Sequence, residues 1–511
     1  MLFLVLLFWR CFNAVVIKTF FQADEYWQAL EPAYEWVFGG AGLTWEWEMG
    51  LRSALHPLIY YLPYTIVKKF DLSFNWFIIL PKVVNGLIAA IGEYFLYHYT
   101  LRKSNNPQLA RTTLILSVIS LWNFYCWPRS FANSLELTLT LVALYNYECS
   151  NITITLLVAA ITCIIRPTNV IFWIYYIPKY IYLNFGNKRL ILNLILKSIL
   201  VTLSVVTIDA FVNYSFYHGL KFPLWQFYKF NVQSNLSAFY GVSRFDFYFF
   251  QAIPILLTTQ LPFFIWGVWT TPLYSDLKLT LVLNLLVFTL LQHKEFRFIY
   301  PNMPALLIYS AQGVLQLENR ISPFTRKIIA FSMVTLFVPA AWYLTQIHEA
   351  GEYALPLVLH ERLINEPQAS VGWLTPCHST PWKSHLGHLK NELWYLTCEP
   401  PKNQFELLNG YMDESDWFYQ DPISFLKLHF PVEDSIEKVD NFSFQKINKL
   451  WDHHCWPHYL VMFETLWIDG DGLNPIGLEH ILNYDVVERL SNSAVHWDSR
   501  REGDLLVLRR R

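Results

Sequence analysis

The stretch FFQADEYWQ, residues 20–28, places two adjacent carboxylates, Asp24 and Glu25, among aromatic side chains. Aromatic rings pack on the C–H faces of sugars, and carboxylates accept hydrogen bonds from sugar hydroxyls. A carboxylate in such a pocket can act as general base toward an alcohol. The same stretch also fits an amphipathic helix at a membrane surface with Asp24 as its N-cap, and composition alone favours neither. The loop continues to about residue 76 with further acids and tryptophans: Glu31, Glu35, Glu46, Glu48, Trp27, Trp36, Trp45 and Trp47.

A second polar cluster is HKEFRFIYP, residues 293–301, which begins a later apolar run. His293, Lys294 and Arg297 place three potential cations within five residues. A helix starting here would put Lys294 and Arg297 on one face, because residues three apart are neighbours on a helix. That arrangement suits the phosphate of a lipid, to which arginine donates two hydrogen bonds. Snorkelling at a span end is the alternative, but Glu295 favours a paired, structured site.

Two further arginines lie at the ends of apolar runs, Arg129 in WPRSFAN and Arg166 in IRPT. Each is a second-rank candidate for neutralising a phosphate. Each also fits a structural role on the carbonyl groups of a helix end, and that role is the more common one for a single arginine.

The elements that position these residues are membrane helices. The chain of 511 residues is 54% hydrophobic and only 15% charged, whereas soluble proteins carry about a quarter charged residues. We predict an all-α polytopic domain over residues 1–345 with about eleven transmembrane helices. The first run is expected to be an uncleaved span whose Arg10 faces the protein interior. The net charge of −2 gives no indication of a nucleic-acid partner. The apolar runs are 3–17, 78–99, 112–127, 133–149, 152–165, 168–183, 190–212, 248–270, 279–292, 298–315 and 327–345.

Residues 346–511 are expected to form a soluble α+β domain, since they hold eleven of the fifteen histidines and no span-length apolar run. Cys377, Cys398 and Cys455 lie here, and one disulfide among them is expected if the domain is luminal, with the pairing left open. Neither DHHCWPH (452–458) nor IDGDGLN (468–474) contains a complete ligand set, so no metal site is predicted.

Loop charges predict which connections share a side of the membrane, because cytosolic loops are enriched in lysine and arginine. The connections expected in the cytosol are 101–111, 186–189, 274–278 and 318–327. The opposite side then collects 20–76, 127–133, 165–168, 213–247 and 293–297, together with the C-terminal domain. Three N-glycosylation sequons agree with that side, at Asn213, Asn235 and Asn441.

The motifs FQADEYWQALEPAY, LTWEWEMGLRS, PRSFANSLE, RPT and HKEFRFIYP together resemble the dolichol-phosphate-mannose-dependent mannosyltransferases of the GT-C superfamily. Within that family, TPCHSTPWKSHLGH (375–388) is similar to the signature of the members that add the third mannose in glycosylphosphatidylinositol (GPI) anchor assembly. One departure is Ala23, where many relatives have proline before the Asp-Glu pair. It affects the rigidity of the loop and removes no titrating group.

The resemblance implies a multi-pass enzyme of the endoplasmic reticulum membrane whose active site and C-terminal domain are luminal. Its donor would be dolichol-phosphate-mannose, and its acceptor the second mannose of the GPI precursor, joined in α-1,2 linkage. A β-linked donor that gives an α-linked product requires inversion, and hence one displacement with a single base. No metal cofactor is expected. A sibling enzyme of N-glycan or fourth-mannose assembly and, more remotely, a lipid transporter are the alternatives.

The resemblance also assigns roles to residues. Asp24 is the candidate base, with Glu25 as its orienting partner or its alternate. The candidates for the donor phosphate are His293, Lys294 and Arg297, followed by Arg129 and Arg166. Trp27, Gln28 and Glu31 are expected to shape the acceptor side.

Overall fold

The chain forms two compact units in the computed structural model. The first unit is Met1–Ile17 with Asp24–Leu344, and the second is Lys18–Ala23 with Thr345–Arg511. The residues that the structure describes are 1–271, 276–318, 320–401, 403, 406, 410–430, 454–468, 477–493 and 496–511. The sequon at Asn441, His453 and nearly all of IDGDGLN lie outside these residues. The catalytic and luminal roles predicted for the two parts of the chain stay predictions.

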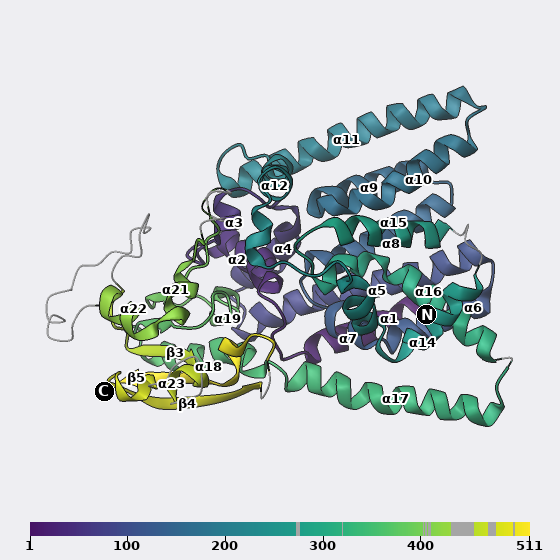
Figure 1. Ribbon diagram of the computed structural model, residues 1–511. Helices are drawn as coiled ribbons and strands as arrows, with labels where there is room; N and C mark the ends of the chain where they lie inside the picture. Colours follow the sequence, from purple (N-terminus) through teal and green to yellow (C-terminus); the bar gives the residue numbers. More distant parts are fainter. Residues whose placement is uncertain are drawn as a thin grey trace. The chain divides into compact units, whose positions relative to one another are not determined.

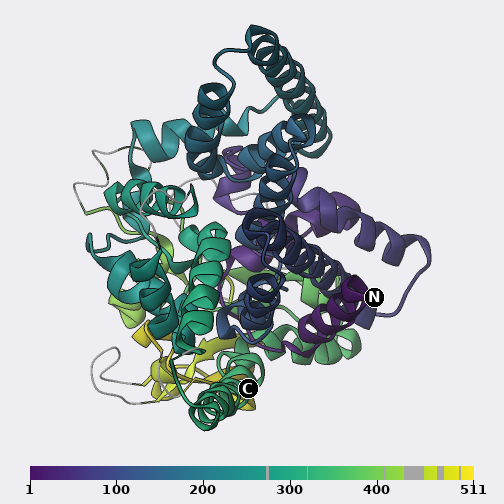
Figure 2. The ribbon, with the colours of Figure 1, turned by 90° about the vertical axis from the view of Figure 1, so that its right-hand side faces the viewer.

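The first unit is helical (Figures 1 and 2). All eleven predicted apolar runs fall on helices. Among the residues that the structure describes, four helical stretches are long and apolar enough to cross a membrane: Asn75–Ser104, Lys188–Tyr217, Tyr248–Thr270 and Pro323–Asn365. The predominantly helical, membrane-type architecture is thus confirmed, whereas the count of eleven spans stays a prediction. The helices are α1 (Leu2–Val16), α2 (Glu31–Phe38), α3 (Trp45–Glu48), α4 (Leu55–Lys69), α5 (Asn75–Ser104), α6 (Pro107–Val118), α7 (Leu121–Cys126), α8 (Ala132–Glu148), α9 (Ile152–Ile165), α10 (Val170–Leu183), α11 (Lys188–Tyr217), α12 (Pro223–Tyr228), α13 (Ile253–Leu257), α14 (Leu261–Thr270), α15 (Asp276–Leu290), α16 (Met303–Glu318) and α17 (Pro323–Gln346).

Local sequence explains how these helices begin, end and pack. At the α5–α6 turn, Asn105 adopts a left-handed conformation (φ 51°), and the side chain of Asn106 accepts from the next backbone N–H groups as an N-cap. Helices α14 and α16 approach closely because both carry glycine at the contact. A Cβ on Gly267 would lie 1.9 Å from the Tyr309 carbonyl oxygen, and one on Gly313 would lie 2.0 Å from that of Phe263.

Contacts between loops agree with the grouping predicted from charge. At one end of the first unit, the Lys103 ammonium lies 2.6 Å from Asp276, which brings the 101–111 and 274–278 connections together. Elsewhere, Asp24 contacts Arg297, and Ala54 donates to Asn213 at 2.9 Å. These pairs bring the first loop to the 293–297 and 213–247 connections. Which end faces the lumen stays a prediction.

Asn213 itself does not fit the predicted glycosylation. It lies in the last turns of α11, is fully buried, and its side chain accepts the hydrogen bond from Ala54. A glycan on its amide nitrogen requires an exposed side chain, so the structure argues against this sequon. Asn235 is half-buried, and its side chain donates to Gln292 at 3.0 Å. Its glycosylation stays a prediction.

A buried ion pair joins Arg10 of α1 to Glu93 of α5, and both side chains have zero exposure. The expectation that Arg10 faces the interior is therefore confirmed. The pair is part of a polar network in which Ser117 donates to Glu93 at 2.9 Å, and Asn123 donates to Ser117 at 3.0 Å. The hydroxyl of Tyr300 then donates to Asn123 at 3.0 Å. The network thus ties α1, α5, α6 and α7 to η7 (Phe296–Asn302), the 3₁₀ helix of the HKEFRFIYP motif.

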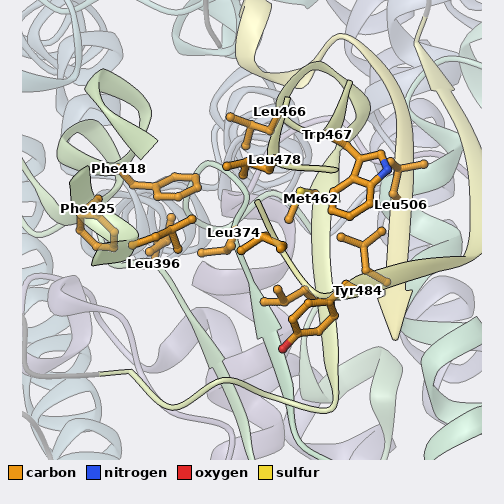
Figure 3. Close-up of a cluster of buried hydrophobic side chains, with 14 of the residues drawn as sticks. Leu374, Leu396, Phe418, Phe425, Met462, Leu466, Trp467, Leu478, Tyr484 and Leu506 are labelled. Carbon is orange, nitrogen blue, oxygen red and sulfur yellow. The ribbon is translucent and has the colours of Figure 1, made fainter. Parts of the chain in front are cut away.

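The second unit contains a five-stranded sheet of order β2-β1-β3-β5-β4. Its first three strands in that order are parallel, and β3, β5 and β4 pair antiparallel. Large apolar side chains from the strands and from the flanking helices fill its core (Figure 3). The predicted α+β composition is confirmed. The elements are β1 (Val371–Trp373), β2 (Leu393–Tyr395), β3 (Tyr459–Phe463), β4 (Tyr484–Ser493), β5 (Gly503–Arg510), α18 (Ala350–Asn365), α19 (Lys383–Leu386), α21 (Glu414–Gln420), α22 (Pro422–His429) and α23 (Glu464–Trp467).

The structure also resolves the cysteine pairing that the sequence left open. Cys377 and Cys398 form a disulfide, whereas Cys455 is exposed and unpaired. Cys377 lies in the TPCHSTPWKSHLGH motif, so the bond fixes this motif beside the end of β2.

Replacing Glu93 with alanine is expected to lower the free energy of unfolding by about 3–5 kcal/mol, because it leaves the Arg10 guanidinium buried without its carboxylate. The measurement is the thermal midpoint of the purified protein in detergent. The double variant Arg10→Met/Glu93→Met removes both charges and is expected to recover most of the loss. A double variant no more stable than Glu93→Ala would contradict this account.

Candidate active site

Asp24 lies at the entry to η1 (Tyr26–Leu30), the first helical turn of the long first loop. Its carboxylate does not cap that turn but pairs with the guanidinium of Arg297 at 2.6 Å. Arg297 also donates from Nε to Glu295 at 2.6 Å and lies over the ring of Phe131. The two motifs singled out in the sequence thus meet in one ion-pair chain, Asp24–Arg297–Glu295.

The neighbouring Glu25 is bound by a different arginine. Its carboxylate lies 2.7 Å from Arg129, and its carbonyl oxygen accepts from the Ser130 hydroxyl at 2.7 Å. Arg129 donates as well to the Tyr125 carbonyl at 2.8 Å, and its side chain is 1% exposed. Burial raises the pKa of Glu25, and the nearby Arg129 offsets only part of that effect. A guanidinium so enclosed fits the structural role of Arg129 better than the phosphate role.

The two carboxylates differ in how exposed their side chains are, and the sequence alone could not show this difference. The Asp24 side chain is 25% exposed, whereas that of Glu25 is 9% exposed. A base must reach the proton that it abstracts. Asp24 is therefore the more accessible of the two carboxylates, and its role as the base stays a prediction.

The HKEFR segment differs from the predicted helical start. Helix η7 begins only at Phe296, so Lys294 and Arg297 do not share a helix face. The Lys294 ammonium donates instead to the Ser243 carbonyl at 3.0 Å, and His293 contacts the Gly241 carbonyl at 3.1 Å. Arg297 pairs with Asp24, whereas His293 and Lys294 contact backbone carbonyl groups of residues 241–243.

Charges within this segment stabilise one another. Burial raises the pKa of Glu295, but Arg297 and His293 outweigh that effect and hold the pKa well below its usual range. Burial lowers the pKa of His293, and its hydrogen bond to Glu295, at 3.2 Å, together with the charge of that carboxylate, raises it above the ordinary value. Glu295 therefore stays ionised and orients both cations.

Arg166 is the least satisfied arginine of this group. It is 8% exposed, and its nearest carboxylate oxygen, on Glu136, is 3.7 Å away. Its Nε has no hydrogen-bond partner among the described residues. The guanidinium lies 5.7 Å from the ring of Phe298, and that ring also faces Arg297 at 6.0 Å. It interacts electrostatically with both Asp24 and Arg297. A buried guanidinium with an unpaired N–H donor is suited to an anion.

Arg52 is a site residue that the sequence analysis did not assign. Its guanidinium lies 2.8 Å from Glu46, and Glu46 also accepts from the amide of Gln28 at 3.0 Å. Arg52 interacts electrostatically with Asp24 and Arg297. It stands in LTWEWEMGLRS, a motif quoted for the resemblance, but no spacing rule links it to Asp24. Glu136, which faces Arg166, was missed for the same reason.

The residues predicted for the acceptor side are buried in the first loop. Trp27 and Glu31 are 4% and 1% exposed, and the Trp27 carbonyl accepts from the Trp47 indole at 3.0 Å. Gln28 is bound to Glu46. Their part in shaping the acceptor side stays a prediction.

The histidines of the DHHCWPH motif that the structure describes have protein partners. His454 contacts Glu414 at 2.7 Å, and His458 accepts from the backbone N–H of Ser370 at 3.0 Å. Among the described residues, the group of side chains close enough to share a cation is Cys377, His378 and Cys398, and its two cysteines form the disulfide. Metal independence stays a prediction.

Comparison with solved structures identifies the fold. ArnT from Cupriavidus metallidurans with undecaprenyl phosphate bound is similar over 99% of this chain and 97% of its own, with a TM-score of 0.57 and 10% identity. The same protein in the apo state gives a TM-score of 0.53. At such identity the likeness concerns the fold alone, and it shows that this chain shares the overall fold of ArnT.

The sequence comparisons identify the family. The model of the Alg9-like mannosyltransferase family matches residues 1–387. Proteins named GPI mannosyltransferase 3 are 39% identical in Debaryomyces hansenii and in Candida albicans and 33% identical in Saccharomyces cerevisiae, each over 99% of this chain and at least 91% of the relative. This chain belongs to the Alg9-like mannosyltransferase family, and the resemblance drawn from its motifs is confirmed.

The contact between His293 and Glu295 should make stability depend on pH in a defined direction. Because the folded state raises the pKa of His293, its stabilisation is complete below the unfolded value of about 6.5 and is lost as the pH rises through the folded value. Glu295, whose pKa is lowered, stays ionised throughout that range. The difference in thermal midpoint between wild type and His293→Gln is therefore expected to shrink, by on the order of 2 °C, from pH 6 to pH 9. A difference independent of pH would contradict the assignment.

Proposed function

We propose that this protein transfers mannose from dolichol-phosphate-mannose, in α-1,2 linkage, to the second mannose of the GPI precursor, and so adds the third mannose. The reaction would take place in the endoplasmic reticulum membrane with the site facing the lumen. The names of its full-length relatives support the pathway. The polyprenyl phosphate named for the ArnT structure supports a donor of that chemical class. The observation that carries the proposal is an accessible carboxylate, Asp24, that pairs with Arg297 and interacts electrostatically with Arg166, whose Nε has no hydrogen-bond partner within the described part of the chain.

The proposed reaction is a single displacement. Asp24 accepts the proton of the acceptor's 2-hydroxyl as that oxygen forms a bond to C1 of the donor mannose. The bond from C1 to the phosphate oxygen breaks on the opposite face, and dolichyl phosphate leaves with the electron pair. Arg297 and Arg166 stabilise the negative charge that develops on the leaving phosphate. Arg52 and Glu46 border the same site.

The direct test uses purified protein, radiolabelled dolichol-phosphate-mannose and a dimannosyl GPI acceptor, with EDTA in one arm and magnesium in the other. We expect a trimannosyl product in both arms, sensitive to an α-1,2-mannosidase. In cells that lack the protein, a GPI precursor with two core mannoses should accumulate. A truncated dolichol-linked oligosaccharide with normal GPI would point instead to a sibling enzyme, and no transfer in either arm would contradict the proposal.

Asp24→Asn is expected to lower kcat by about 100- to 10,000-fold, because it removes the base and keeps the shape of the side chain. The matched control is Glu25→Gln in the adjacent residue. That variant is expected to lower the thermal midpoint through its weakened contact with Arg129, while each folded molecule still turns over. The reverse pattern would move the base to Glu25.

Arg166→Met is expected to lower kcat/KM about 10- to 100-fold, which is the cost of one charge-assisted hydrogen bond to the phosphate. Arg129→Met is the control, since that arginine is fully engaged with Glu25 and Tyr125. It should lower the yield of folded protein more than the activity of each folded molecule. Unchanged kinetics in Arg166→Met would remove this residue from the phosphate site.

A further inference from the structure

A buried carboxylate that the proposed reaction does not use, that of Glu136 on α8, lies beside Arg166 at the end of α9. The Glu136 side chain is 3% exposed. Its Oε2 atom lies 3.7 Å from Nε of Arg166, which is within the range of an ion pair but too long for a hydrogen bond. Glu136 therefore offsets part of the charge of Arg166, while the Nε–H of Arg166 has no partner among the described residues.

Neutral amide side chains hold this carboxylate in place. The Asn169 amide donates to its Oε1 at 2.9 Å and to the Thr140 hydroxyl at 2.9 Å. The Asn133 amide donates to its Oε2 at 3.4 Å. The oxygen of the Asn169 amide accepts from the Trp173 indole at 3.0 Å, which fixes the orientation of that amide. The carboxylate is thus bound by donors other than the arginine, and Arg166 keeps an N–H that an anion can use.

The proposed reaction changes the charge of the group that this arginine binds. The donor phosphate is a diester with one negative charge, whereas dolichyl phosphate is a monoester with about 1.5 to 2 negative charges near pH 7. Electrostatic attraction grows with the product of the two charges. An arginine without a carboxylate beside it would therefore bind the product more tightly than the donor and slow its release.

We infer that Glu136 is a positioning residue that acts through Arg166, and that it speeds the release of dolichyl phosphate by weakening the binding of phosphate to this arginine. Its negative charge offsets the attraction between Arg166 and an anion, and the offset is larger for the product than for the donor. The inference rests on the proposed function, because dolichyl phosphate is the product of that reaction.

Helix α8 supplies a matched control at its other end. Glu148 follows Glu136 by twelve residues, and this separation corresponds to about 18 Å along the helix. The Glu148 carboxylate pairs with Lys103 at 2.6 Å, and Lys103 has a second carboxylate, that of Asp276, at 2.6 Å. Glu148→Gln therefore removes the same charge from the same helix at a distance from Arg166.

The experiment compares wild type, Glu136→Gln and Glu148→Gln as full-length protein at pH 8, with the Kd of dolichyl phosphate measured by direct binding. We expect Glu136→Gln to lower that Kd about tenfold and the donor KM by a smaller factor. Its steady-state kcat should fall while the rate of the first turnover is kept, because slower release limits only the later turnovers. Glutamine keeps an oxygen that accepts from Asn169. Glu148→Gln should behave as wild type in all of these measurements.

An unchanged or raised Kd for dolichyl phosphate in Glu136→Gln would overturn the inference, since structural damage around Arg166 weakens phosphate binding. If Glu136→Gln does not fold, Glu136→Asp keeps the charge and draws it back by one methylene. We expect that variant to lower the same Kd by a smaller factor, and an unchanged Kd would again overturn the inference. A wild-type protein that transfers no mannose would instead contradict the proposed function, because binding is measured without turnover.

Discussion

The fold of the first unit has to hold a separate arginine beside each of two adjacent carboxylates, Asp24 and Glu25. Two adjacent carboxylates would repel each other, and an opposite charge beside each one offsets that repulsion. Arg297 serves Asp24 and Arg129 serves Glu25. The two arginines come from connections far apart in the sequence, so the helices between them must bring both loop ends to the first loop. Glu25, which pairs with the more deeply buried arginine, is thereby the more buried of the two carboxylates.

A second buried pair extends the same logic deeper into the unit. Arg10 and Glu93 gain little net stability from each other once their desolvation is counted, but each makes the other indispensable. Through Ser117 and Asn123 the network reaches Tyr300, which lies three residues after Arg297 on η7. The arginine that faces Asp24 is therefore carried by a short 3₁₀ helix, and the hydrogen bond of Tyr300 anchors that helix one turn further along. Such anchoring limits the movement of the backbone that carries Arg297.

The sequence predicted the parts of the site that stand out chemically and missed those defined by their partners. Asp24 and Arg297 were accessible to prediction, because charged clusters among aromatic residues are rare in an apolar chain. The choice between Asp24 and Glu25 was not, since it depends on which arginine binds each one. Lys294 and Arg297 do not share a helix face as expected, because the helix begins at Phe296 and leaves Lys294 outside it. The disulfide between Cys377 and Cys398 likewise depended on the fold.

Hydrogen bonds to α11 hold the later part of the first loop. Ser53 donates to Asp209 at 2.5 Å, and the Tyr217 hydroxyl donates to the Arg52 carbonyl at 2.6 Å, with Asp209 and Tyr217 both on α11 of the first unit. Without such contacts, a loop rich in carboxylates would sample many arrangements of its charges. The contacts to α11 confine this part of the loop within the first unit.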